Sequence, residues 1–370
     1  MQASSSRLVP RLLRRQVQCD YRNARSLSTL PYPSNRCVHL PYRSVLQISG
    51  PDAQKFLKGL TTRDVEKLQG GYSGFLNASG RVLHAVFVIP VQGAKVPTYY
   101  IVHETPADHP APLESTLPPF KLRSKVRIRD VTAEWDVWTS WSEEAGPLPQ
   151  RSFKAGSGGG SEAQWTWPDG IRDLRLGEGE LGCWDLRAQT NDSGRQMLVP
   201  KGKTPSIAAT LDQGDINDYH LRRMVLGLPE GPKEIVPEAA LPLESCMDIH
   251  GGVDFRKGCY LGQELTVRTY HTGATRKRIL PVLVDDGLLG TGDITYHPPA
   301  SAASQKSRPA GKVLSVHESG RVGLGLVRLE MAERANWITG DRGRLTIEVA
   351  GKEQEIHAAK GEAYAAALEA

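Results

Sequence analysis

Cysteine is scarce in this chain, and its arrangement excludes the common cysteine-based frameworks. The five cysteines stand at positions 19, 37, 183, 246 and 259 of 370 residues. None belongs to a Cys-x-x-Cys pair, and no Cys/His cluster has the spacing of a zinc finger. An odd and sparse set predicts reduced thiols rather than the disulfides of a small secreted domain.

Long hydrophobic runs are also missing. The longest, residues 82–91, covers ten residues and contains His84, whereas a membrane-spanning helix needs about twenty. The sequence therefore predicts neither a membrane span nor a secretory signal. Its 39% hydrophobic and 24% charged residues are typical of a globular protein, and its length favours two or three domains.

Acidic residues are nearly absent from residues 1–36, which hold seven arginines and a single acid, Asp20. This segment contributes +6 to a net charge of +5, so the rest of the chain carries −1. An Arg-rich, Ser-rich and acid-poor leader predicts a mitochondrial transit peptide and a place in the matrix, with a disordered basic tail as the alternative. The near-neutral remainder gives no support for nucleic-acid binding.

Two nucleotide-binding patterns lack a required residue or context. Lys201-Gly-Lys-Thr204 resembles the end of a phosphate-binding loop, but Met197 stands where the first glycine is needed. Gly323 and Gly325 lie inside a strand pattern, which favours a bend in a strand over a dinucleotide fingerprint. Neither pattern predicts a nucleotide site.

Between residues 37 and 275 strand and helix patterns are mixed. Helices are predicted over 53–60 and 215–226, and a hairpin over 74–89. A Gly/Ser-rich insertion near 142–163 predicts a flexible loop. The fold class is therefore α+β over 37–275.

Short strands separated by turns follow in residues 276–370 and predict a small antiparallel β-barrel. The expected strands are 279–284, 292–296, 311–316, 323–329 and 345–349.

Residues 121–130 alternate basic and apolar side chains. This pattern fits a strand that faces an anion, or a solvated edge strand, and we favour the solvated edge.

The stretch Lys257-Gly-Cys-Tyr-Leu-Gly-Gln-Glu264 places one thiol among turn-forming and polar residues. A helix is predicted to begin at Gly262 or just after it, so Cys259 lies upstream of a helix N-terminus and near Lys257. Both features favour the thiolate, which is a nucleophile and a soft ligand for iron or copper(I). A single cysteine cannot hold an iron–sulfur cluster alone, so a metal role would require ligands from a partner.

Two other interpretations of Cys259 stay open. It is a small buried residue in a tight turn, or a nucleophile with His271, His250 or His84 as its base. No protease signature surrounds it, which disfavours the second interpretation.

This stretch, with Leu265-Thr-Val-Arg268 and His271-Thr-Gly273 after it, resembles the signature of the YgfZ/GcvT folate-binding superfamily. With the leader, the chain is similar to the branch of Caf-type transferases that serves mitochondrial iron–sulfur cluster assembly. The likeness covers most of residues 38–285. Further matching segments are 50–57, 61–64, 75–82, 121–126, 222–227 and 241–244.

The resemblance implies an aminomethyltransferase-like cloverleaf, with two α+β domains and a C-terminal β-barrel around a central channel that holds tetrahydrofolate in relatives. By position in the motif, Tyr260, Gln263, Glu264 and Arg268 would face the pterin or the channel. Lys257 would lie near the anionic tail of the folate.

The chain departs from the family at one chemical position. Aminomethyltransferases carry an acidic pair where this sequence reads His84-Ala85, which puts aminomethyl transfer in doubt. A histidine on an apolar strand is either a proton shuttle or, as we favour, a satisfied core residue.

The function that the resemblance implies is maturation of mitochondrial [4Fe–4S] proteins, both aconitase-type and radical-SAM targets such as lipoate synthase. The chain would act with an A-type cluster carrier, and Cys259 would be a shared and transient metal ligand. The alternative is a tetrahydrofolate-dependent one-carbon transferase.

Overall fold

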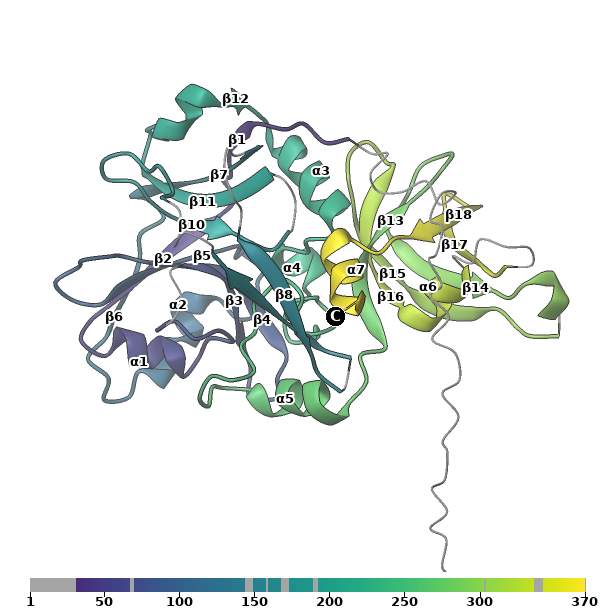
Figure 1. Ribbon diagram of the computed structural model, residues 1–370, viewed down its shortest axis with the longest axis horizontal. Coiled ribbons are helices and arrows are strands. Elements are labelled where there is room, and N and C mark those ends of the chain that lie inside the picture. Colours follow the sequence, from purple (N-terminus) through teal and green to yellow (C-terminus); the bar gives the residue numbers. More distant parts are fainter. Residues whose placement is uncertain are drawn as a thin grey trace, which may run out of the picture.

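Two five-stranded sheets, a two-stranded hairpin and a closed six-stranded barrel make up the β-structure of this computed structural model (Figure 1). The sheets lie on one side of the molecule and the barrel on the other. The structure describes residues 31–66, 70–143, 149–157, 159–167, 173–188, 192–302, 304–335 and 342–369.

The first sheet has the strand order β3-β4-β5-β2-β6, and all its neighbours are antiparallel. Its strands are β2 (Ser44–Ser49), β3 (Gly71–Leu76), β4 (Val82–Pro90), β5 (Thr98–His103) and β6 (Arg127–Asp130). Helix α1 (Ala53–Lys58) buries Phe56 and Leu57 in one core with Ile48 of β2. Short helices α2 (Leu113–Thr116) and η2 (Pro118–Phe120) precede β6. The predicted helix and hairpin are confirmed.

The second sheet has the order β10-β11-β7-β1-β12. Its strands are β1 (Arg36–His39), β7 (Trp135–Glu143), β10 (Leu181–Asp185), β11 (Asp192–Pro200) and β12 (Asp212–Gln213), with η3 (Ser206–Thr210) before β12. Trp141 of β7 donates its indole N–H to Pro33 O at 2.7 Å. The last residues that the sequence assigned to the leader therefore pack on the folded body, while residues 1–30 lie outside the described part.

Helix α3 (Ile216–Leu226) joins the second sheet to the barrel through contacts with β1, β13 and β16. Asp215 and Asp218 form a reciprocal capping box at its start. Gly227, with φ 71°, ends it in the left-handed conformation. These bounds confirm the helix predicted over 215–226.

The Gly/Ser-rich insertion differs from its prediction, because its described part is a hairpin and not a patternless flexible segment. Strands β8 (Gln150–Ala155) and β9 (Ser161–Thr166) pair along their whole length. Side-chain atoms at Gly156 or Gly160 would meet the ring of Tyr270 within 3.0 Å. Glycine therefore permits close packing here. Residues 144–148 and Gly158 lie outside the described residues.

The barrel closes in the order β13-β16-β15-β14-β17-β18. Its strands are β13 (Lys277–Leu283), β14 (Gly292–His297), β15 (Arg308–Val316), β16 (Val322–Arg328), β17 (Arg344–Val349) and β18 (Lys352–Ala358); η4 (Ala300–Ala302), α6 (Leu329–Ala335) and α7 (Glu362–Glu369) complete this part. Gly323 and Gly325 lie in β16, as the strand interpretation predicts. Strand β18 was not predicted. Among the described helices, none combines the length and the apolar character that a bilayer crossing needs.

Candidate functional site

Residues 254–262 form a tight surface turn that is fastened to the segment following α1. The side chain of Asp254 accepts hydrogen bonds from the backbone N–H groups of Arg256 (2.8 Å) and Lys257 (3.1 Å). Backbone N–H groups of Asp254 and Leu261 donate to Thr62 O and Gly59 O, both at 3.0 Å. We call residues 254–262 the signature turn. Its backbone is held at both ends.

Gly262 ends the signature turn and begins helix α5 (Gln263–Thr272). Its φ is 77°, and a Cβ there would lie 2.2 Å from Asn77 O in the β3–β4 turn. Only glycine satisfies both the conformation and the close approach. The Gln263 side chain accepts from Tyr260 N at 3.3 Å. The predicted helix start after Gly262 is confirmed.

Cys259 is exposed in the middle of this turn. The preceding residue, Gly258, has open space around it, since an added Cβ would meet no atom within 4 Å. The other three cysteines of the described chain are buried. Burial raises the pKa of Cys37 to about 12 and of Cys246 to about 11, and it also raises that of Cys183. Among the described cysteines, Cys259 alone can reach a visiting molecule.

Lys257 fixes the turn from inside. Its ammonium donates to three backbone carbonyls, those of Lys58 (2.7 Å), Thr61 (2.5 Å) and Arg63 (3.2 Å). The same group lies 4.8 Å from the ring centroid of Tyr260. Burial lowers its pKa to about 8. The structure therefore places Lys257 as a positioning group for the loop.

The other residues expected to face folate differ in their exposure. Tyr260 is buried, and among the described residues its hydroxyl has no hydrogen-bond partner. Gln263 is half-buried, whereas Glu264 and Arg268 are exposed one turn apart on α5. None of these side chains lines the cavities of about 530 and 420 Å³ found elsewhere on the protein.

His84 is a buried core residue on β4. Its Nε2 lies 2.7 Å from Ala111 O, and its ring stacks on His109 with centroids 4.1 Å apart. Burial lowers the pKa of His84 to about 4, so the ring is neutral near pH 7. This environment agrees with the satisfied-core interpretation of His84.

The other two candidate bases for Cys259 have different surroundings. His250 is buried, with its ring nitrogens 3.0 Å from Arg187 O and Gly227 O, and burial lowers its pKa to about 3. The neutral ring that this burial favours has a single N–H and donates it to one of these two carbonyls. His271 is exposed near the end of α5, and its ring packs edge-on against Tyr270 with centroids 5.1 Å apart.

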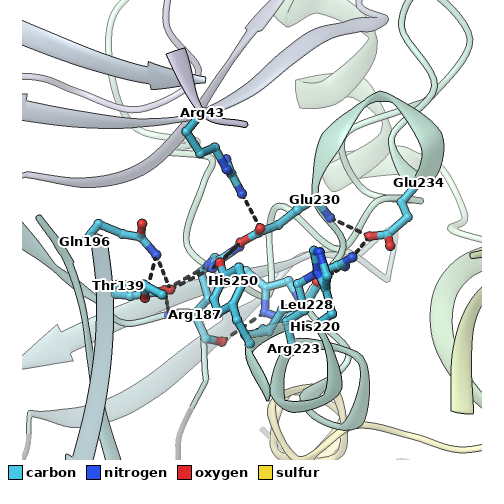
Figure 2. Close-up of polar contacts among 12 residues, drawn as sticks. Arg43, Thr139, Arg187, Gln196, His220, Arg223, Leu228, Glu230, Glu234 and His250 are labelled. Atoms are coloured by element: carbon cyan, nitrogen blue, oxygen red, sulfur yellow. Dashed lines mark hydrogen bonds and ion pairs between the residues drawn. The ribbon is translucent and has the colours of Figure 1, made fainter. Parts of the chain in front are cut away.

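A buried ion-pair network lies where the two sheets, α3 and the barrel meet (Figure 2). Glu230 stands at its centre and pairs with Arg43 and with Arg187, the latter at 2.6 Å. Tyr219 donates its hydroxyl to the same carboxylate at 2.6 Å. Burial opposes ionisation of Glu230, but the neighbouring arginines outweigh it and hold the pKa of this carboxyl well below its usual range.

The network extends from Glu230 into the barrel through Glu234. Arg223 of α3 pairs with Glu234 at 2.6 Å, and Ser315 of β15 donates to it at 2.6 Å. On the other side, Arg187 grips Asp185 through two hydrogen bonds of 2.8 and 2.7 Å. We call these residues the central network. Sequence reasoning missed it, because Arg43 and Glu230 are 187 positions apart and carry no local signal.

The described ranges contain no group of three or more His, Cys, Asp or Glu side chains arranged to hold a metal ion.

This chain is similar to a known domain family and to curated proteins. The model of the CAF17 C-terminal β-barrel domain matches residues 276–360. The mitochondrial iron–sulfur cluster assembly factor IBA57 homologue of Cryptococcus neoformans is 58% identical over 90% of this chain and 97% of its own. The IBA57 homologue of Aspergillus oryzae is 34% identical over 85% of this chain and 75% of its own.

One solved structure supports the fold. Aminomethyltransferase T of the glycine cleavage system from Bartonella henselae superposes with a TM-score of 0.60, covering 90% of this chain and 87% of its own. Its sequence identity is 13%, so this likeness concerns the fold alone. The expected aminomethyltransferase-like fold with a C-terminal β-barrel is confirmed.

Proposed function

Because the chain belongs to the IBA57 family of mitochondrial iron–sulfur cluster assembly factors, we propose that it takes part in iron–sulfur cluster assembly in the mitochondrial matrix, with Cys259 as its metal-binding group. The observation that carries this proposal is the exposure of the Cys259 thiol on a turn whose backbone is fastened on both sides. The buried cysteines are poor candidates, because burial holds them in the thiol form.

The cluster is cargo that Cys259 shares with a second protein. One thiolate supplies one ligand, whereas cluster irons normally require several. The remaining thiolates then come from the partner, and we propose a carrier of the A-type class. Exposed Glu264 and Arg268 beside the turn offer charges of both signs to such a partner.

The recipients that we propose are mitochondrial [4Fe–4S] proteins of the aconitase and radical-SAM types, including lipoate synthase. A shared site suits delivery, because a cluster that this protein holds through a single ligand can pass to a recipient with a full ligand set.

Replacement of the thiol tests this function. In a strain lacking the protein, Cys259→Ser should fold normally but fail to restore aconitase activity and protein lipoylation. Thr272→Ala is the matched control, since it removes one exposed side-chain oxygen near the far end of α5 and should restore both. Full rescue by Cys259→Ser would remove the metal role of this residue.

Tetrahydrofolate-dependent one-carbon transfer is the competing function and has weaker support. The buried and unpaired hydroxyl of Tyr260 is compatible with a further ligand, but Glu264 and Arg268 are exposed and the ammonium of Lys257 is committed to carbonyls. Titration of the purified protein with tetrahydrofolate separates the two functions. Tight binding that Tyr260→Phe abolishes, with turnover of an aminomethyl adduct, would favour the transferase.

A further inference from the structure

A groove of about 530 Å³ opens at the edge of the first sheet, on the basic segment that precedes and enters β6. Cations and hydroxyls converge on it: Lys121, Lys125 and Arg127, with Ser49, Thr98 and Ser124. Ammonium, guanidinium and hydroxyl groups are the donors that recognise phosphate oxygens. The chemistry of the groove therefore suits a phosphate-bearing ligand.

The cations at this groove have no acidic partner among the described residues. Among the described residues, Lys121, Arg123, Lys125 and Arg127 take part in no ion pair. Arg129, two positions further along the same strand, is paired with Glu134 at 3.1 Å. The nearby carboxylate of Asp52 accepts the backbone N–H of Lys125 at 2.7 Å. Within the described residues, the positive charge of residues 121–127 is thus not neutralised by an ion pair.

Apolar side chains stand exposed around the same groove. Val96, Phe120 and Leu122 are 42%, 40% and 88% exposed, and they are three of the six large hydrophobic residues exposed in the described chain. Val96 comes from the β4–β5 turn, and the other two from the segment before β6. Leu122 has φ 44°, a conformation that non-glycine residues rarely adopt.

Edge-strand protection explains only part of this surface. Strand β6 is the outer strand of its sheet, and charged residues there prevent edge-to-edge pairing. That role accounts for Arg127, but it would be weakened by exposed leucine and phenylalanine beside it. Three exposed hydrocarbon side chains would also contribute nothing to the binding of a free anion.

Exposed apolar residues on loop tips, set among unpaired cations, are the elements that bind anionic lipid surfaces. We propose that Val96, Phe120 and Leu122, with Lys121, Lys125 and Arg127, form a docking patch for an anionic phospholipid membrane. The groove takes a lipid phosphate, and the apolar side chains enter the headgroup region. This inference concerns a different surface from Cys259 and does not rest on the proposed function.

Helix α1 connects this docking patch to the signature turn. Asp52, just before α1, bonds to Lys125, whereas Gly59, just after it, accepts from Leu261. A helix of six residues spans about 9 Å. In Figure 1, β6 and α1 lie together at the lower left, with α5 at the bottom centre. Docking would thus hold the Cys259 turn close to the lipid surface.

Flotation with vesicles tests the patch on the full-length protein. Vesicles of phosphatidylcholine alone are compared with vesicles that also contain cardiolipin, at low and high salt. Two double variants remove the charge (Lys121→Glu with Lys125→Glu) or the apolar tips (Phe120→Ser with Leu122→Ser). The matched controls are Lys306→Glu with Lys352→Glu, and Leu288→Ser, all at exposed positions in the barrel part.

We expect salt-sensitive binding to the anionic vesicles only, reduced about tenfold or more by each patch variant and unchanged by the controls. Absence of binding, or equal binding by patch and control variants, would overturn the proposal. The proposal would also be overturned if inorganic phosphate displaced the protein from the vesicles and Phe120→Ser with Leu122→Ser had no effect on binding. That result would assign the groove to a free anion. If an acidic peptide displaced the protein from the vesicles and the apolar substitutions again had no effect, the groove would be assigned to a protein partner.

Discussion

The signature turn and the central network are both rich in polar residues, but they differ in what is exposed to solvent. In the central network every carboxylate is held by arginine or tyrosine at close distance, and its charged members are almost fully buried. In the signature turn the backbone is fastened, yet the thiol at its middle is left open to solvent. Polar density alone therefore does not mark a reactive site. What distinguishes Cys259 is that its thiol is exposed while the backbone on both sides of it is hydrogen-bonded.

The largest loss of stability is expected from a substitution in the central network. Glu230→Ala would leave Arg43 and Arg187 buried without their shared carboxylate. We expect a loss of roughly 3–5 kcal/mol in the free energy of unfolding, measured by urea denaturation. Glu330→Ala is the control, because it removes the same side chain from an exposed pair with Arg334 and should cost less than about 1 kcal/mol. Equal costs would mean that the central network contributes no special stability.

A smaller loss of stability is expected from a substitution of Lys257, which fastens the signature turn. Lys257→Met removes three hydrogen bonds to the carbonyls of residues 58, 61 and 63 but keeps the hydrocarbon stem. We expect a loss of about 1–3 kcal/mol and faster amide exchange across residues 254–262. Unchanged exchange in the turn would show that its backbone is held without Lys257.

The pH dependence of the free energy of unfolding should reflect the lowered pKa values of the buried histidines. The pKa of His84 is about 4 when folded, against 6.5 for an exposed histidine, so between these values the unfolded chain binds a proton that the folded chain does not. Stability is complete above pH 6.5 and declines as the pH falls towards 4, by about 1.4 kcal/mol per pH unit for each such group.

His84→Gln should make this decline shallower by one group, as seen by comparing urea unfolding at neutral pH and near pH 5. His250, whose pKa is lowered to about 3, retains its own contribution. A variant with the same slope as the parent would show that the pKa of His84 is the same in the folded and the unfolded chain.

The smallest effect on stability is expected at Cys259. Cys259→Ser should change the free energy of unfolding by less than about 0.5 kcal/mol, since the side chain is exposed. In the native parent protein, a thiol reagent followed by peptide mapping should label Cys259 well before Cys37, Cys183 and Cys246. Simultaneous labelling of all four would contradict the rigid and selective exposure described above.

The sequence predicted those features whose signal is local. Helix α3 was predicted over 215–226 and spans Ile216–Leu226, because an apolar face at helical spacing is a local signal. Strand β18 was missed, since charged and polar residues dominate it and Ile356 and Ala358 are its only buried ones. The hairpin of β8 and β9 was missed because its glycines read as flexibility, whereas they make room for Tyr270.

The candidate site was predictable in part for the same reason. The spacing from Gly262 into α5 is a local pattern, and it placed Cys259 correctly before a helix. The direction of each side chain depends on distant segments. Lys257 turns towards carbonyls about 196 positions away, and no local pattern encodes that choice. The central network likewise depends on partners from five separate stretches of the chain, at residues 43, 185–187, 219–223, 230–234 and 315.

Strand β1 has a consequence for the order in which the chain can fold. It lies between β7, about a hundred positions later, and β12, which ends at Gln213. Whether the polypeptide emerges from a ribosome or from a translocation pore, this strand appears first and must wait for both neighbours. Over that interval its edges are open, so a chaperone that shields the first-emerging segment should speed productive folding of this protein.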